Sequence, residues 1–346
     1  MKSHILVAGG AGYIGSHTVR ALVKSGFKVT VLDSLEHGHR AAIVDQGVDL
    51  VVSDMGDAEA MEELFSSNSF DAVINFAGYV NVGESVKDPL KYYHNNVGNS
   101  VIFLQAMQNA GVKNLVFSST CATYGVIDTL PISEQESQAP INSYGRSKLM
   151  FEHILNDCET AWGLKSVCLR YFNACGASQD SLIGEDHTPE THLIPLVLQA
   201  AKGIRENITV FGTDYPTPDG TCIRDYVHVN DLADAHIKAV ERLLNGGESL
   251  KCNLGTGQGF SANEIIQVAK RITECDIPVV YGERREGDPP ELVANPTLAN
   301  TELQWTPQSS SIENIVQTAW NWMQNNDGRY PSTRPSFHKA HGGIFS

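Results

Sequence analysis

The sequence lacks most of the features that mark secreted, membrane-spanning or zinc-binding proteins. Its seven cysteines are an odd number and form no C-x-x-C pair, which fits reduced thiols better than a disulfide framework or a zinc site. A strand-like run begins at residues 4–8 and leaves no room for a secretory signal before it. No apolar run approaches the roughly 18 residues that a membrane span needs. We therefore expect a cytoplasmic protein without a membrane partner.

Positive charge is also scarce. The chain has 25 Lys and Arg against 40 Asp and Glu, a formal net charge of −15. This surplus of negative charge argues against nucleic acid as a partner, although arginines gathered in a cleft can still bind an anionic ligand. With 346 residues, 42% of them hydrophobic, the chain is long enough for one large α/β unit and a smaller lobe.

The first two thirds of the sequence alternate between short β-branched runs and amphipathic stretches. The apolar runs are ILVAG, KVTVLD, VDLVVSD, DAVINFAG, NLVFSS and KSVCLRYFN. Helical patterns lie between them, around residues 60–65, from about 95 to 109 and from about 144 onward. Strands buried on both faces and joined by helix-length connections predict a parallel, doubly wound α/β sheet of the Rossmann type.

The pattern changes after Asn173. Residues 174–224 are rich in Gly, Pro and polar residues, with one short helix near 193–202, and further strands are predicted in DYVHV and CNLGTG. We predict a Rossmann domain of residues 1–174 plus about 225–260. A smaller substrate-binding lobe, about 175–224 plus 261–346, would cover the carboxyl edge of the sheet, where ligands bind in such folds. Residues 327–346 show little hydrophobic periodicity, and we expect them to be loosely attached.

A glycine-rich segment, ILVAGGAGYIGSHTVRALVKSG, lies between the first strand and the first helix. Glycines at positions 9, 10, 12 and 15 allow a tight turn and let backbone N–H groups approach a pyrophosphate. The second strand ends in Asp33, 18 residues beyond Gly15, where an acid binds an adenosine ribose. The alternative is a structural glycine turn beside a surface aspartate.

The residues after Asp33 decide between the two dinucleotides. Ser34 and Leu35 are uncharged, and no arginine for a 2′-phosphate occurs before Arg40. The segment therefore favours NAD over NADP. The next two strand ends supply Asp54, which could meet the adenine, and the small residues Ala77 and Gly78, past which a cofactor could lie. Each of these positions alone is better explained by sheet packing than by binding, but as a series of strand ends they favour a cofactor site.

SYGRSKLMFE contains Tyr144 and Lys148, four residues apart and therefore on one helix face. A tyrosine with a pKa near 10 is a poor base at neutral pH. A neighbouring ammonium, together with a cationic nicotinamide, is expected to favour its phenolate. The alternative is a solvated helix face. The preceding strand ends in three hydroxyl residues, Ser118, Ser119 and Thr120. The family resemblance described next implies that these hydroxyls face the reacting carbon.

Together these motifs resemble the extended short-chain dehydrogenase/reductase family, and within it the UDP-galactose 4-epimerases. The resemblance covers roughly residues 4–325. Its motifs are GGAGYIGSHT, FAGYVNVGES, YYHNNVGNS, FSSTCATYG, SYGRSKLMFE, RYFNACGA, YPTPDGTCIRDYVHVNDLA, NLGTG and RREGD, in the order of the family.

The resemblance implies a role for each matching position. Tyr144 would take the proton from the 4-hydroxyl of the sugar, Lys148 would tune Tyr144 and hold the nicotinamide ribose, and Thr120 would bond O4 and the tyrosine. The implied NAD contacts are Gly9, Gly12, Tyr13, Ile14, Gly15, Asp33, Asp54, Met55, Phe76, Ala77, Asn95, Ser118, Tyr144, Lys148 and Phe172. The implied substrate contacts are Thr120, Tyr144, Asn173, His192, Leu193, Phe211, Arg224, Arg285, Asp288 and Leu292.

Several alternatives bear on the substrate and on metal binding. Related dehydratases carry an Asp-Glu pair after the threonine, where this chain has Cys121 and Ala122, so dehydration is disfavoured. Arg224 and Arg285 could instead pair with neighbouring acids on the surface. DYVHVNDLADAH offers His and Asp side chains but is better explained by a strand followed by a helix capped at Asn230, so we predict no metal.

Three positions depart from the family pattern. Val80 stands where some members carry a lysine near the nicotinamide, and His192 replaces an asparagine often found before the short helix. Leu292 stands where some members place a large tyrosine against the 2-substituent of the sugar, which leaves room for N-acetylated substrates.

The resemblance implies an isomerase that interconverts UDP-galactose and UDP-glucose through a 4-keto sugar, with NAD retained. Two alternatives stay open: a 4-epimerase acting mainly on UDP-N-acetylhexosamines or UDP-pentoses, and a non-catalytic protein that senses NAD or a sugar nucleotide. The family also suggests a homodimer formed by helices around 95–109 and 144–158.

Overall fold

Seven parallel strands form the main sheet of the protein. A computed structural model of the chain describes residues 2–285 and 288–331. The strand order is β10-β6-β5-β4-β1-β2-β3, and the predicted doubly wound sheet is confirmed. The strands are β1 (His4–Ala8), β2 (Lys28–Asp33), β3 (Asp49–Val52), β4 (Ala72–Asn75), β5 (Asn114–Thr120), β6 (Lys165–Tyr171) and β10 (Leu250–Leu254). Every residue of β1 is buried, as its unbroken apolar sequence requires.

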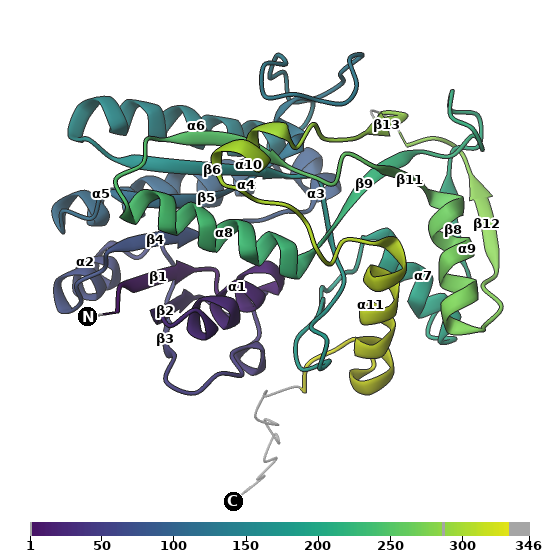
Figure 1. Cartoon of the computed structure of the whole chain (residues 1–346), viewed down its shortest axis with the longest axis horizontal. Coiled ribbons are helices and arrows are strands. Elements are labelled where there is room, and N and C mark those ends of the chain that lie inside the picture. Colours follow the sequence, from purple (N-terminus) through teal and green to yellow (C-terminus); the bar gives the residue numbers. More distant parts are fainter. Residues whose placement is uncertain (1, 286–287, 332–346) are drawn as a thin grey trace, which may run out of the picture.

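Helices cover both faces of this sheet (Figure 1). On one face, α1 (Tyr13–Lys24) and α8 (Val229–Leu244) pack with the small α10 (Thr297–Glu302). On the other face, α2 (Ala58–Ser67), α5 (Ser100–Asn109) and α6 (Ser143–Trp162) enclose a second apolar core. Strand order changes direction between β1 and β4, which opens a crevice at the carboxyl edge.

The segment predicted as one helix from about 95 to 109 is built from several pieces. It begins earlier, with α3 (Val82–Lys87) and α4 (Pro89–Tyr93), and continues through a π-helical turn at His94–Asn99 into α5. Single π-helical turns inside α-helices are frequent at functional sites. Two short 3₁₀ turns, Arg40–Ala42 and Cys121–Thr123, follow strands β2 and β5.

The remaining elements form a smaller part around a third apolar core, on the right in Figure 1. Strands β7 (Asn173–Cys175), β11 (Gly259–Ser261) and β13 (Glu291–Leu292) pair with β9 (Ile223–His228), and β8 (Ile208–Phe211) pairs with β12 (Val279–Gly282). Helices α7 (Leu193–Ala201), α9 (Ala262–Thr273) and α11 (Ile312–Asn326) complete it. The predicted domain boundaries stay a prediction, although α10 packs on the larger core from beyond residue 261.

Two local predictions were wrong. Helix α8 is capped by His228 rather than by Asn230, because the His228 side chain accepts the backbone N–H of Asn230 at 3.1 Å. The first residues of the tail are attached rather than loose. The backbone N–H of Tyr330 donates to Asp186 at 2.9 Å, and its ring lies 4.9 Å from that of Trp322. The tail from residue 332 onward lies outside the described residues.

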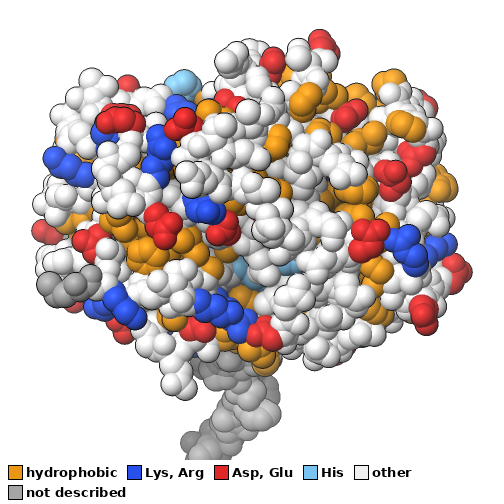
Figure 2. All heavy atoms as spheres, in the orientation of Figure 1, with side chains coloured by type: hydrophobic (Ala, Val, Ile, Leu, Met, Phe, Trp, Pro, Cys, Tyr) orange, Lys and Arg blue, Asp and Glu red, His pale blue; other side chains and the backbone are white. Residues whose placement is uncertain are grey.

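Acidic and basic side chains are interspersed over the face shown in Figure 2. None of the helices in the described ranges is long and apolar enough to cross a bilayer.

A buried ion pair joins α6 to the sheet. Arg170 of β6 donates from Nε to Glu152 at 2.9 Å and from a terminal nitrogen at 2.6 Å, and both side chains are almost fully buried. Ser119 of β5 donates to the same carboxylate at 2.6 Å. Burial alone would raise the pKa of Glu152, but hydrogen bonds from Arg170 and its charge outweigh burial and hold the pKa below its usual value. Helix α6 is therefore anchored to the sheet by a charged contact.

We expect Glu152→Gln to lower the free energy of unfolding by about 3–5 kcal/mol, because it leaves the Arg170 charge buried without its partner. Glu159→Gln is the matched control on the same helix, since its pair with Lys165 lies at the surface and should contribute much less. Urea unfolding of both variants measures the difference. A loss at Glu152→Gln no larger than that of the control would contradict this role.

Candidate active site

The predicted cofactor residues follow successive strands at one edge of the sheet. The glycine turn follows β1, and Asp33 ends β2. Asp54 and Met55 follow β3, Phe76 and Ala77 follow β4, Ser118 lies in β5, and Phe172 follows β6. Because the strands are parallel, all of these positions lie on the carboxyl edge, where the crevice opens.

The glycine turn is closely packed and suited to a pyrophosphate. Gly9 has a φ of +75°, and a Cβ atom there would lie 2.6 Å from the backbone nitrogen of Ala77. A Cβ atom on Gly15 would lie 2.2 Å from the carbonyl oxygen of Gly9. Helix α1 begins at Tyr13, and its N-cap residue Gly12 provides no side-chain cap, so the first N–H groups of the helix face the turn. A helix start of this kind binds phosphate groups, and the residues present fit a dinucleotide.

Asp33 is held in place by the same turn. Its carboxylate accepts the N–H of Ala11 at 2.9 Å and the N–H of Leu35 at 2.9 Å. Burial raises the pKa of Asp33, and these two donors only partly offset the shift. The aspartate is thus oriented toward the crevice rather than lying free on the surface, which supports the ribose role over the surface-acid alternative.

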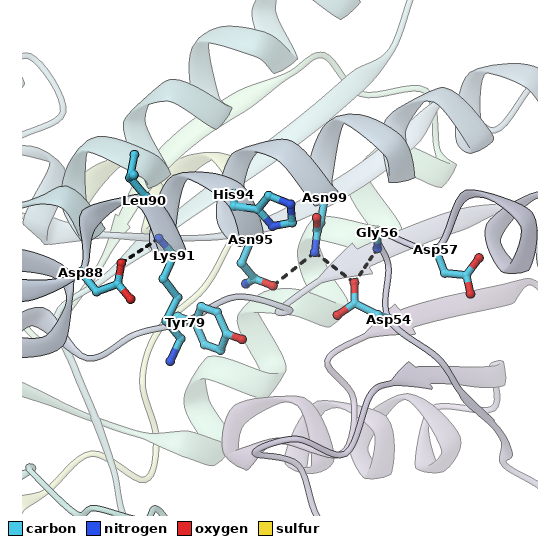
Figure 3. Close-up of a pocket in the computed structure, with 10 residues that line it drawn as sticks. All are labelled: Asp54, Gly56, Asp57, Tyr79, Asp88, Leu90, Lys91, His94, Asn95 and Asn99. Carbon is cyan, nitrogen blue, oxygen red and sulfur yellow. Dashed lines mark hydrogen bonds between the residues drawn. The ribbon is translucent and has the colours of Figure 1, made fainter.

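A pocket of about 750 Å³ extends the crevice beyond β3 (Figure 3). Asp54 and Asn95, both predicted cofactor residues, line it together with Tyr79 and Asn99. The Asp54 carboxylate accepts Gly56 N–H at 2.6 Å and Asn99 Nδ2 at 3.0 Å. This pocket at the end of β3 has both polar and apolar lining surface. It lies where the adenine end of the dinucleotide was predicted.

The side chains of three predicted cofactor residues pack or form hydrogen bonds within the protein. Met55 is buried in the core under α2 and α5, and Phe76 packs 4.5 Å from the ring of His236. Tyr13 donates its hydroxyl to the carbonyl oxygen of Gly176 at 2.6 Å and so joins the glycine turn to the smaller part. Met55 and Phe76 can therefore reach a cofactor mainly through their backbone atoms.

The end of β5 and the start of α6 are in direct contact. A Cβ atom on Gly145 would lie 2.4 Å from the carbonyl oxygen of Ala122, so only glycine permits this approach. Asn142 caps α6 by accepting the N–H of Gly145 at 2.8 Å. The contact brings Tyr144, on the first turn of α6, within hydrogen-bonding reach of Thr120.

Lys148 lies one turn further along α6. Its ammonium donates to the carbonyl oxygen of Ser118 at 2.9 Å and lies 4.9 Å from the centre of the Phe117 ring. Both contacts fix the lysine at the carboxyl end of β5. The predicted catalytic residues Tyr144, Lys148 and Thr120 are thus gathered at one place, and the solvated-face alternative does not hold.

Burial dominates the electrostatics of this group. It raises the pKa of Tyr144 to about 12, while a hydrogen bond with Thr120 acts in the opposite direction. It also lowers the pKa of Lys148 to about 8. In the chain alone the loss of hydration therefore dominates the pKa of Tyr144. The expectation that Lys148 and a cationic nicotinamide together favour the phenolate stays a prediction.

The three hydroxyls at the end of β5 do not share one direction. Ser119 donates to the buried Glu152, on the α6 side of the strand, as described above. Side chains alternate along a strand, so Ser118 and Thr120 lie on the opposite side. The expectation that all three face the reacting carbon was therefore wrong for Ser119.

The predicted substrate residues lie mainly around β9 and β13. Arg224 of β9 forms an ion pair with Asp288 rather than with Asp225. Asp225 is fully buried and accepts N–H groups of the loop after β10, including Thr256 at 2.8 Å. Leu292 of β13 is paired with Arg224 across the strands.

Two further pairs complete this region. The guanidinium of Arg285 lies 4.1 Å from the centre of the Phe211 ring, a cation–π contact. The alternative pairing with a neighbouring acid stays open, because Glu286 lies outside the described residues. Asn173 donates from its side-chain amide to the carbonyl oxygen of Asp225 at 3.1 Å.

His192 and Leu193 are at the start of α7, and here the structure shows a group that the sequence analysis missed. The Nδ1 atom of His192 lies 2.7 Å from Glu185 and 3.0 Å from Glu190, so it is already engaged by two carboxylates. His187 joins the same group. Its signal in the sequence is the spacing E-x-H-x-x-E-x-H over residues 185–192, whereas only the histidines near 228–236 were weighed as ligands.

Comparison with known proteins agrees with this geometry. Residues 5–255 match the model of the NAD dependent epimerase/dehydratase family. A UDP-glucose 4-epimerase of Lacticaseibacillus casei is 49% identical over 93% of this chain and 97% of its own length. One of Streptococcus mutans is 51% identical over 92% of this chain and 96% of its own. The crystal structure of UDP-glucose 4-epimerase from Brucella ovis in complex with NAD superposes with a TM-score of 0.90 and 49% identity, covering 92% of this chain and 98% of that one.

The glycine turn, the series of strand ends and the full-length likeness thus lead to one assignment. This chain belongs to the NAD dependent epimerase/dehydratase family.

Proposed function

We propose that the chain is an isomerase that interconverts UDP-galactose and UDP-glucose by inverting C4 of the sugar, with NAD as its cofactor. The observation that carries this proposal is the convergence of Tyr144, Thr120 and Lys148 at the carboxyl end of β5, beside a turn that fits a dinucleotide. The names of its relatives support the same reaction.

The chain's own residues handle the proton at O4. NAD⁺, when bound, supplies a hydride acceptor for C4 and a positive charge that favours the Tyr144 phenolate. Tyr144 removes the O4 proton as C4 is oxidised to a 4-keto sugar, with Thr120 holding O4 in reach. The keto sugar then presents its other face, and Tyr144 returns the proton as C4 is reduced.

The smaller part holds the nucleotide end of the substrate. Arg224 and Arg285 supply guanidinium groups for the diphosphate, and Asp288 supplies a carboxylate for the uridine ribose. In the chain alone Arg224 is paired with Asp288, so a diphosphate would share or replace that pair. Asn173, His192, Leu193, Phe211 and Leu292 are the other proposed contacts.

Dehydration of the sugar is not supported by the residues after Thr120. Burial raises the pKa of the Cys121 thiol to about 12, so it stays neutral near pH 7. The backbone N–H of Ala122 donates to Thr120 Oγ1 at 3.1 Å, and the alanine side chain has no group that transfers protons. No acid–base pair is therefore available at the two positions where water elimination would need it.

We expect the purified chain to convert UDP-galactose to UDP-glucose, without added cofactor if NAD is retained and with added NAD otherwise. Tyr144→Phe should lower the rate about 10²–10⁴-fold, because the proton then has no acceptor. Tyr281→Phe, at an exposed tyrosine, is the matched control and should keep the rate. Chromatography of the products measures the conversion rates of the wild-type chain and of the two variants.

The proposed reaction and the proposed role of Tyr144 can be contradicted separately. If the wild-type chain fails to convert UDP-galactose even with NAD added, the proposed reaction is wrong. If Tyr144→Phe converts as fast as the control, the reaction stands and the role of Tyr144 is wrong.

We also propose that the pocket accepts UDP-N-acetylhexosamines. Leu292 packs beside Cys121, Tyr124 and Phe172, next to the proposed reaction centre. Its side chain is smaller than the tyrosine that some relatives of the family place at this position. The space freed by leucine would hold an acetyl group on C2 of the sugar.

Leu292→Tyr should therefore reduce conversion of UDP-N-acetylgalactosamine by about 10–200-fold relative to UDP-galactose, a range typical of steric discrimination in an apolar pocket. The ratio of kcat/KM for the two substrates measures the effect. Leu292→Met, of similar volume, is the control. An unchanged ratio in Leu292→Tyr would show that this side chain does not limit the pocket.

We further propose a homodimer formed through α5 and α6. Val101 on α5 is 47% exposed and Met150 on α6 is 44% exposed, and both helices pack over the same core through their other faces. Two apolar side chains on adjacent outer helix faces suit a two-fold interface.

Met150→Glu should weaken self-association at least about 30-fold, since residues that anchor an interface typically contribute 2 kcal/mol or more. Ile204→Glu is the matched control, because Ile204 is equally exposed (51%) but lies beyond α7. Sedimentation of both variants over a concentration series measures the dimer. Equal weakening by both substitutions, or none by Met150→Glu, would place the interface elsewhere.

The cysteines support a cytoplasmic location. All seven are free thiols in the structure, and four of them are buried. Reduced, buried thiols are typical of a reducing compartment.

A further inference from the structure

The group at residues 185–192 lies in the connection between β7 and α7. Glu185, His187, Glu190 and His192 each offer one nitrogen or oxygen atom, and these four atoms all lie within 4.8 Å of one another. The roles proposed above use only His192. The segment is anchored on both sides, because Asp186 accepts the N–H of Tyr330 at 2.9 Å and the His187 ring packs edge-on against Tyr13 at 6.1 Å.

The separations between the histidine nitrogens and the carboxylate oxygens are near those of a tetrahedral metal site. Nδ1 of His192 lies 2.7 Å from Oε1 of Glu185 and 3.0 Å from Oε1 of Glu190, and Nδ1 of His187 lies 3.2 Å from Oε1 of Glu185 and 3.7 Å from Oε2 of Glu190. Zinc–ligand distances of about 2.0–2.2 Å place neighbouring ligand atoms about 3.3–3.6 Å apart in a tetrahedron. The observed separations lie around that value.

Two of these atoms are buried and, among the described residues, make no hydrogen bond of acceptable geometry: Oε1 of Glu185 and Nδ1 of His187. Oε1 of Glu185 lies at ion-pair distance from both histidines, 2.7 Å from Nδ1 of His192 and 3.2 Å from Nδ1 of His187. The Glu185 side chain is only 6% exposed. Buried polar atoms without a hydrogen bond are costly, so such atoms in a folded protein call for a ligand.

The Glu190 carboxylate is already positioned to act as a metal ligand. Its Oε1 atom accepts the backbone N–H groups of Thr191 at 2.7 Å and His192 at 2.8 Å. Backbone donors of this kind orient a carboxylate and hold it ionised, as the partners of metal ligands do.

We propose that Glu185, His187, Glu190 and His192 together bind one divalent transition-metal ion, and that Zn²⁺ fits this donor set best. Two imidazole nitrogens favour zinc over Mg²⁺ or Ca²⁺, which prefer oxygen ligands throughout. Four protein ligands close the coordination sphere, so the ion is structural rather than catalytic. It fixes the start of α7 against the glycine turn, through His187 and Tyr13.

The competing account is a network of ion pairs. Burial opposes a charge on His187, but its interaction with the nearby carboxylates of Glu185 and Glu190 outweighs burial and raises the pKa of His187 to about 9. Protonated histidines and two carboxylates would then balance without a metal. The two accounts differ in whether the full chain holds Zn²⁺ with one-to-one stoichiometry.

The test treats the purified full chain with a chelator, removes the chelator, and titrates Zn²⁺ against a competing zinc indicator. We expect one tightly bound Zn²⁺ per chain, not displaced by Mg²⁺, and a rise in thermal unfolding temperature on adding it. His187→Gln and Glu190→Gln should each weaken binding by more than about 100-fold, because loss of a direct ligand exceeds the 10–100-fold effect of losing a supporting contact.

Two controls separate this site from other histidines. His153→Gln, at an exposed histidine of α6, should leave the stoichiometry unchanged. The double variant His338→Gln/His341→Gln tests the two histidines of the tail. Circular dichroism of every variant checks that it is folded. Failure of the wild-type chain to bind Zn²⁺, or loss of binding in the tail variant but not in His187→Gln, would overturn the proposal.

Discussion

The approach of α6 to the end of β5 determines where Tyr144, the proposed proton-transfer residue, lies. It depends on one glycine, since any side chain at position 145 would collide with the carbonyl oxygen of Ala122. The same helix is held further along by the buried contact between Glu152 and Arg170. Tyr144 directly precedes the first anchor and Lys148 lies between the two. The geometry of this proposed catalytic pair is therefore set by packing and charge on α6 rather than by a flexible loop.

Burial creates the electrostatic problem that the bound cofactor would solve. Tyr144 and Lys148 both lose hydration, which shifts the pKa of each in the direction that favours its neutral form. In the proposed mechanism an oxidised nicotinamide would supply a positive charge that favours the phenolate. The state of the proposed base would then be coupled to the state of the cofactor, and Tyr144 would be a stronger acid when the dinucleotide is oxidised.

The two parts of the molecule are joined at a few specific contacts. Tyr13 extends from the glycine turn to Gly176, and the segment around residues 184–192 packs between Tyr13 and Tyr330. The glycine turn lies on the larger core, whereas α7 and Arg224 belong to the smaller part. A substrate bound to both parts therefore depends on these contacts for its alignment with the base.

Elements that follow from local pattern were predictable from the sequence. Unbroken β-branched runs specify buried strands, the glycine spacing specifies the turn, and a four-residue interval places Tyr144 and Lys148 on one helix face. These features depend on neighbours in the chain, and the fold class and the cofactor followed from them. The resemblance to a known family added the substrate.

Only the tertiary structure decided the rest. Ser119 could not be assigned to Glu152 from sequence, because this partner lies 33 residues away, on helix α6. The pKa shifts of Tyr144 and Lys148 depend on how much water each loses on folding. The pairing of Arg224 with Asp288 and the gathering of two glutamates with two histidines likewise require distances between side chains. Local sequence determines to which side of a helix or strand each side chain points. Burial and pairing between residues distant in sequence arise only when the chain folds.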